Sequence, residues 1–158
     1  MADFRLRKDT EAWFKHIAGK PPLETKFDLY YLCMLLGIVT RRTSLATDAP
    51  GFVDNFVESY RPQSLLIMGL ALLAELKAIG CELDERDEVR RQLARLVGPG
   101  GVSNDGVAVL NGYASGGFDY LQERYGDLPP YSAEAFLPAF VELLTGAVDE
   151  EPLWSFAL

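Results

Sequence analysis

The sequence predicts an all-α fold, a compact single-domain helical bundle of about six to seven helices. Apolar residues recur at steps of three and four along most of the chain, and the strict alternation typical of strands is rare. The chain has 158 residues, of which 49% are hydrophobic and 24% charged, as in one ordinary globular domain with its own core. The longest apolar run, from Leu65 to Ala74, is too short for a membrane span, which needs about 20 residues. It therefore predicts a central apolar helix near residues 62–79.

The N-terminal third predicts two helices and a short third one. Asp9 or Thr10 can cap a first helix that ends at Gly19, before two prolines. A second helix is expected over residues 24–39, because its apolar positions form one face and basic residues follow its end. The stretch TSLATDAPG then predicts a loop, and a short helix is expected over residues 52–57.

The remaining helices begin with the apolar one, which Gly80 is expected to end. Asp84 can cap the next helix, in which acidic residues precede arginines in the order that the helix dipole favours. The stretch GPGGVSNDG interrupts the chain, and Ser103 can cap the helix that follows it. A last helix over residues 132–144 contains Pro138, which predicts a kink. We expect a helical domain over residues 1–148 and an acidic-aromatic tail over residues 149–158.

The stretch NGYASGGFDYL, residues 111–121, is glycine-rich and could be a phosphate-binding loop or a helix. It lacks the lysine and hydroxyl residue of a P-loop and the GxGxxG spacing of a dinucleotide site. Its apolar residues instead fall at helical steps, in one stripe from Val107 to Tyr125. The helix is therefore the better interpretation. Because interior glycines weaken a helix by about 0.5–1 kcal/mol each, Gly112 and Gly116 predict a place where another helix packs closely, in this chain or in a second copy.

The net charge of −8 is distributed unevenly along the chain. Residues 1–42 carry eight basic and five acidic side chains, whereas residues 43–158 carry seven basic and eighteen acidic ones. An acidic protein is a poor general binder of nucleic acid, because that binding depends on neutralising phosphates. A local basic face for DNA or an acidic partner would consist of Arg5, Arg7, Arg41 and Arg42. The alternative is that these arginines are ordinary solvated charges.

Residues for catalysis, metals or cofactors are few. His16 is the only histidine, which excludes a two-histidine metal site. Cys33 lies between apolar neighbours and predicts a buried thiol rather than a nucleophile. The acidic runs lack the spacing of a calcium loop. We therefore expect no catalytic residue, no metal and no cofactor. The N-terminus carries no secretory signal, so we also expect a cytoplasmic protein with reduced thiols.

The tail combines an acidic run with apolar and aromatic residues, as short docking peptides do. A partner would contact Leu153, Trp154, Phe156 and Leu158. The alternative is that the aromatic residues fold back onto the surface of the same domain.

Two segments together resemble a known family. The segment from Phe27 to Leu45, FDLYYLCMLLGIVTRRTSL, is similar to the helix and basic turn of the bacterial Dnd-system-associated protein 4 family. The segment from Asn111 to Glu123, NGYASGGFDYLQE, resembles that family's tyrosine–alanine–small–small–glycine helix. The apolar helix lies between them in the expected order, so the resemblance covers roughly residues 5–125. The chain from about Pro129 onward is not covered.

This resemblance implies a biological context and no chemistry. Proteins of that family are encoded with DNA phosphorothioation systems, in which sulfur replaces a backbone oxygen and associated proteins restrict unmodified DNA. They are small accessory proteins that offer no established catalytic residue to carry over. The leading hypothesis is a non-enzymatic accessory protein of such a DNA-modification or anti-phage system, binding other proteins of the operon. The alternatives are direct DNA binding through the basic N-terminal residues and an acidic DNA mimic.

Overall fold

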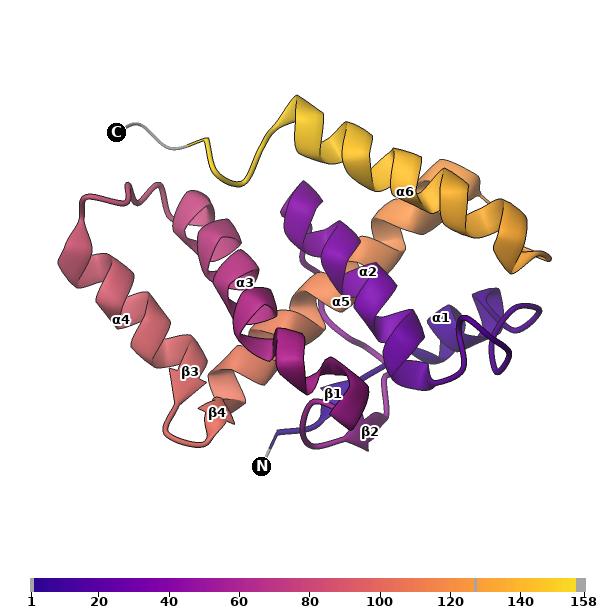
Figure 1. The fold of residues 1–158 in the computed structure, drawn as a ribbon, viewed down its shortest axis with the longest axis horizontal. Coiled ribbons are helices and arrows are strands. Elements are labelled where there is room, and N and C mark those ends of the chain that lie inside the picture. The colour runs from indigo at the N-terminus through magenta and orange to yellow at the C-terminus, as the bar shows by residue number, and fades with distance from the viewer. Residues whose placement is uncertain (1, 127, 156–158) are drawn as a thin grey trace.

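A computed structural model describes residues 2–126 and 128–155, and it confirms a mostly helical single domain (Figure 1). The described residues form six α-helices, one 3₁₀-helix and two short antiparallel strand pairs. In chain order these are β1 (Phe4–Arg5), α1 (Lys8–Trp13), α2 (Lys26–Thr40), β2 (Gly51–Val53), η1 (Glu58–Gln63), α3 (Ser64–Ala78), α4 (Arg86–Leu96), β3 (Val97–Gly98), β4 (Gly101–Val102), α5 (Asn104–Tyr125) and α6 (Ala133–Glu150).

The crossing of α2 and α5 forms the centre of the molecule (Figure 1). Two glycines bring the backbones of these helices together. A Cβ atom added to Gly37 would overlap the carbonyl oxygen of Tyr113, and one added to Gly117 would overlap that of Cys33. The buried side chains around this crossing, including Tyr30, Leu36 and Phe118, make up much of the core.

The most apolar helix, α3, packs against α2, α4 and α5. One face of α3 is buried, through residues such as Ile67 and Ala71, but Leu65 and Leu66 are 75% and 65% exposed. Figure 1 shows α4 at the end of the molecule opposite α1, and α3 between α4 and the crossing of α2 and α5.

Helix starts agree with the predictions where a hydroxyl residue caps the helix. Ser103 Oγ accepts a hydrogen bond from the Gly106 amide, and Ser132 Oγ accepts one from the Ala135 amide. Thr25 caps α2 and forms a reciprocal capping box with Asp28. Asp84 does not cap α4, whose N-cap is Glu85 without a side-chain hydrogen bond.

The first helix also differs from its prediction. Asp9 and Thr10 lie inside α1, and the helix ends at Trp13, while turns continue to residue 19. The N-cap residue of α1 is Arg7, whose side chain forms no capping hydrogen bond. Apolar spacing located the buried side chains Trp13, Phe14 and Ile17 correctly, but not the helix end.

Short strands replace two predicted features. Residues 51–53 form β2, which pairs with β1 near the N-terminus, and a 3₁₀-helix follows at residues 58–63, so the helix expected over 52–57 is absent. The stretch GPGGVSNDG supplies the turn and second strand of the β3–β4 hairpin. Strands of two or three residues are too short to display alternation, which explains why the sequence did not reveal them.

The last helix extends past the predicted domain boundary. α6 begins at Ala133 and continues through Pro138 to Glu150. Leu153, in the expected tail, is only 2% exposed. The first part of the tail therefore belongs to the folded domain.

Candidate functional site

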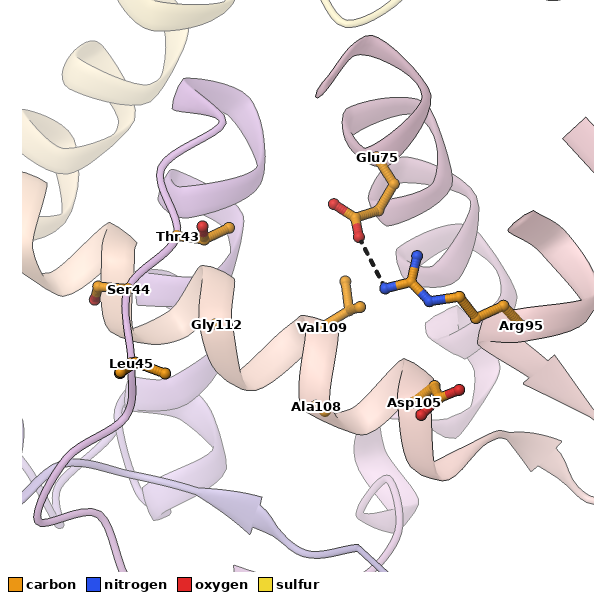
Figure 2. A pocket seen from close by; sticks show the side chains of 9 residues that line it. All are labelled: Thr43, Ser44, Leu45, Glu75, Arg95, Asp105, Ala108, Val109 and Gly112. Carbon is orange, nitrogen blue, oxygen red and sulfur yellow. Dashed lines mark hydrogen bonds and ion pairs between the residues drawn. The ribbon is translucent and has the colours of Figure 1, made fainter. Parts of the chain in front are cut away.

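A groove of about 500 Å³ lies beside the small-residue helix α5 (Figure 2). Its walls come from four parts of the chain: the extended segment after α2, the C-terminal half of α3, the end of α4, and the first turns of α5. We call it the α5 groove. It is lined by Thr43, Ser44, Leu45, Glu75, Arg95, Asp105, Ala108, Val109 and Gly112.

Glu75 is the most constrained charged group in the α5 groove. Its Oε2 accepts a hydrogen bond of 2.7 Å from the Tyr113 hydroxyl, and its Oε1 lies 3.3 Å from an Arg95 nitrogen (Figure 2). Burial, followed by the hydrogen bond to Glu75, raises the pKa of Tyr113 well above its usual value. Tyr113 therefore remains a neutral donor, and Glu75 joins α3 to both α4 and α5.

The remaining polar groups of the α5 groove are held by the chain itself or open to solvent. The hydroxyls of Ser44 and Ser115 are 2.7 Å apart, and Ser115 also donates to the Leu45 carbonyl. Asp105 is exposed in the first turn of α5. This arrangement suits polar contacts with a ligand or protein, and its lining contains neither histidine nor cysteine.

Three of the four arginines of the predicted basic face form separate ion pairs with carboxylates of the same chain. Arg7 lies 2.6 Å from both Asp9 and Asp119, and its side chain is 15% exposed. The guanidinium of Arg42 binds both carboxylate oxygens of Glu123, at 2.7 and 2.9 Å, and this hydrogen bonding lowers the pKa of Glu123.

Arg41 and Arg5 are also engaged. Arg41 ends α2 in a left-handed conformation, with a φ of 53°, and its side chain pairs with Glu151. Arg5 is exposed, and its side chain donates to the Ala49 carbonyl at 3.0 Å. The fold does not gather Arg5, Arg7, Arg41 and Arg42 into a cluster of unpaired cations.

The two predicted packing glycines have different environments. A Cβ atom added to Gly116 would overlap the backbone of Arg42, which belongs to the segment after α2 rather than to a helix. A Cβ atom added to Gly112 would lie 3.8 Å from the Thr43 side chain, an ordinary contact distance. The closest helix contact is instead made by Gly117 and Gly37, neither of which the glycine argument singled out.

The tail folds back over the ends of α2 and α3. Besides the Arg41–Glu151 pair, Lys77 donates to the Ser155 carbonyl at 2.6 Å. Leu153 is buried, whereas Trp154 is 64% exposed. Phe156 and Leu158 lie outside the described residues. Of the proposed docking residues that are described, only Trp154 is presented to solvent.

The residues considered for catalysis are not assembled into a site. Cys33 is fully buried, and its burial raises the thiol pKa to about 12. The His16 ring stacks on Tyr131, with ring centres 4.2 Å apart. Within the described part of the chain, no group of three or more His, Cys, Asp or Glu residues is arranged to hold a metal ion.

A second surface depression lies between α3 and α4, and its lining is almost entirely apolar. We call it the α3–α4 groove; its volume is about 470 Å³. Its large apolar side chains Leu65 and Leu93 are 75% and 44% exposed, and Arg90 is its one charged lining residue. It is lined by Leu65, Met68, Gly69, Arg90, Leu93, Ala94 and Val97.

The sequence argument did not identify the α3–α4 groove, because no local pattern shows which apolar side chains two neighbouring helices leave exposed. A usable signal was present. α3 is apolar around its whole circumference, and the stripe Val89, Leu93 and Leu96 of α4 is narrow, so two adjacent helices could not bury all of their apolar surface against each other.

Comparisons of the chain with protein-family models, curated proteins and solved structures give no match. Among the described residues, no helix combines the length and the apolar character that crossing a membrane requires.

Proposed function

We propose that this protein works by binding another protein through the outer face of α3 and α4. The observation that supports this most directly is the exposure of Leu65 and Leu66 in the first turn of α3, the most apolar helix. Large exposed apolar side chains usually mark an interaction surface when they gather in one region. Leu65 and Leu93 line one groove and are 75% and 44% exposed, and Leu66, next to Leu65, is 65% exposed.

The other surfaces support this proposal less well. The α5 groove is larger, but its central carboxylate, Glu75, already binds Tyr113 and Arg95. The arginines proposed for DNA contact are mostly paired with carboxylates of the same chain. An apolar surface with few charges is typical of the core of a protein–protein interface.

The biological context of this proposal comes from the family resemblance alone. We propose that the partner is another protein of a DNA-modification or anti-phage defence operon, and that this protein is a non-enzymatic accessory component. Its two resembling segments form α2 with the following turn and the middle of α5, the two central helices. The resemblance therefore involves the central helices, and the proposed partner-binding face lies on α3 and α4.

Co-expression with the products of the flanking genes tests the proposal. We expect the double substitution Leu65→Ser and Leu66→Ser to reduce recovery of a partner at least about tenfold, because exposed apolar anchors carry much of the binding energy of an interface. Val141→Ser is the matched control, since Val141 is 56% exposed on α6. Equal recovery of a partner by the unsubstituted chain, the Leu65→Ser and Leu66→Ser variant and the Val141→Ser control would contradict the proposal. So would the absence of any partner among these gene products.

A further inference from the structure

The α3–α4 groove has a defined shape and charge, and these restrict what can occupy it. It shares Leu65, Met68 and Val97 with a neighbouring depression of about 260 Å³ that extends to the β3–β4 hairpin. The two depressions therefore adjoin each other. An elongated groove between two helices suits an elongated occupant such as a third helix.

The floor of the α3–α4 groove is open to close approach by another backbone. Gly69, in the middle of α3, has no heavy atom within 4 Å of the position that a Cβ atom would take. Ala94 lies on the opposite wall and also carries a small side chain. Small residues at such positions allow a packed helix to lie deep between its neighbours.

The charged side chains that line this groove and the adjoining depression are basic, although the chain has a net charge of −8. Arg90 lines the groove and Arg61 lines its extension. Arg61 donates to the Phe56 carbonyl at 3.2 Å. Within the described part of the chain, neither arginine has a carboxylate partner, and neither depression has a carboxylate in its lining. Acidic side chains on the occupant would provide the missing partners.

A second copy of this chain fits the groove less well. In a two-fold symmetric pair each groove would face the same groove of the other copy, so Arg90 would approach another Arg90 with no acidic lining residue between them. The occupant that matches the groove carries the opposite charge.

We infer that the α3–α4 groove binds an amphipathic helix of a different protein, with an aliphatic stripe flanked by Asp or Glu residues. This inference rests on the proposed function and specifies the chemistry of the partner. The aliphatic stripe would cover Leu65, Met68 and Leu93, and the acidic side chains would pair with Arg61 and Arg90.

The test uses synthetic helical peptides of about five turns, with leucines at i, i+3, i+4 and i+7. Three peptides share this stripe and differ only in flanking Glu, Gln or Lys residues. Fluorescence anisotropy with the full chain should rank the affinities Glu first, Gln second and Lys last. A combined Arg61→Glu and Arg90→Glu variant should reverse that order. Equal affinities, or no saturable binding of the Glu peptide, would overturn the inference.

A matched pair of glycine variants locates the binding. Gly69→Leu should fill the groove and weaken binding of the Glu peptide at least about tenfold, while Gly146→Leu in α6 should leave it unchanged. Neither glycine has a neighbouring heavy atom within 4 Å of its added Cβ, so both variants should keep the melting temperature of the unsubstituted chain or exceed it. Unchanged binding by Gly69→Leu would remove the groove as the site.

Two measurements separate this inference from the proposed function. If co-expression recovers a partner that the Leu65→Ser and Leu66→Ser variant loses, but the peptides show no charge ranking, the proposed function stands and the acidic helix is excluded. If light scattering shows a dimer that Gly69→Leu converts to a monomer, the occupant is a second copy and the inference is wrong.

Discussion

At the scale of single residues, Asn111 connects the start of the chain to the two central helices. Its Oδ1 accepts hydrogen bonds from the Arg5 amide at 3.0 Å and from the Tyr30 hydroxyl at 2.9 Å. Its Nδ2 donates to the Asp3 carbonyl at 3.0 Å. The residue is only 8% exposed, so water cannot readily replace these bonds. One side-chain amide thus fixes the N-terminal strand on α5 and α2.

Replacing Asn111 with alanine should lower the free energy of unfolding by about 2–3 kcal/mol, because it leaves the buried Tyr30 hydroxyl and two backbone groups without partners. Adding Tyr30→Phe should restore part of that loss, since the buried hydroxyl is then absent. Urea unfolding measures both effects. Asn104→Ala provides an exposed control, because Asn104 accepts only the Ala2 amide at the surface. If Asn111→Ala cost no more than Asn104→Ala, the assignment of this structural role would be wrong.

At the scale of elements, the fold depends on how closely α2 and α5 approach. Gly37 and Gly117 each face the backbone of the other helix. Neither glycine has a positive φ, so the requirement is for space and not for an unusual backbone conformation. The glycine-rich stretch of α5 therefore has a structural role within one chain. Helix period and helix caps define each element separately, whereas these contacts define which elements meet.

The glycines of α5 should respond differently to the same substitution. Gly117→Ala should destabilise the protein by about 1–3 kcal/mol or more, because the new methyl group would overlap the Cys33 carbonyl and force the helices apart. Gly112→Ala should be neutral or stabilising by up to about 1 kcal/mol, since the methyl group has room and alanine favours the helix. Thermal unfolding followed by circular dichroism distinguishes these outcomes. Similar losses for both variants would argue against the α2–α5 crossing described above.

At the scale of the whole molecule, charges that are separated in the sequence are paired in space. The basic N-terminal part supplies Arg7, Arg41 and Arg42, and the acidic remainder supplies Asp119, Glu123 and Glu151. Each pair joins residues that are far apart along the chain. The uneven distribution of charge therefore produces ion pairs within the chain, and each of these three arginines already binds a carboxylate.

This pairing predicts no salt-sensitive binding of duplex DNA. Because Arg7, Arg41 and Arg42 already bind carboxylates, the dissociation constant for a labelled duplex should be weaker than about 10⁻⁴ M at physiological salt. Fluorescence anisotropy over a range of salt concentrations checks this. A clear slope of log affinity against log salt, reduced by Arg42→Ala, would instead support direct DNA contact.

Local patterns in the sequence were sufficient for the helical class, for the start of α5 at the Ser103 cap, and for the burial of residues such as Trp13 and Phe118. They failed for the short strands, whose few residues cannot show a period, and for the end of the first helix. They also failed to bring Glu75, Arg95 and Tyr113 together, because no local rule relates three residues on three helices.

The sequence by itself determined the helical class and the net acidity, because both depend on residue types and their spacing along the chain. Only the tertiary structure decided that the first turn of α3 is exposed, that three of the N-terminal arginines are paired, and that an apolar groove flanked by Arg61 and Arg90 is exposed. The physical reason is that apolar content measures how much surface a helix would bury. Which neighbour buries it depends on how closely two backbones can approach, and in this chain Gly37 and Gly117 allow α2 and α5 the closest approach.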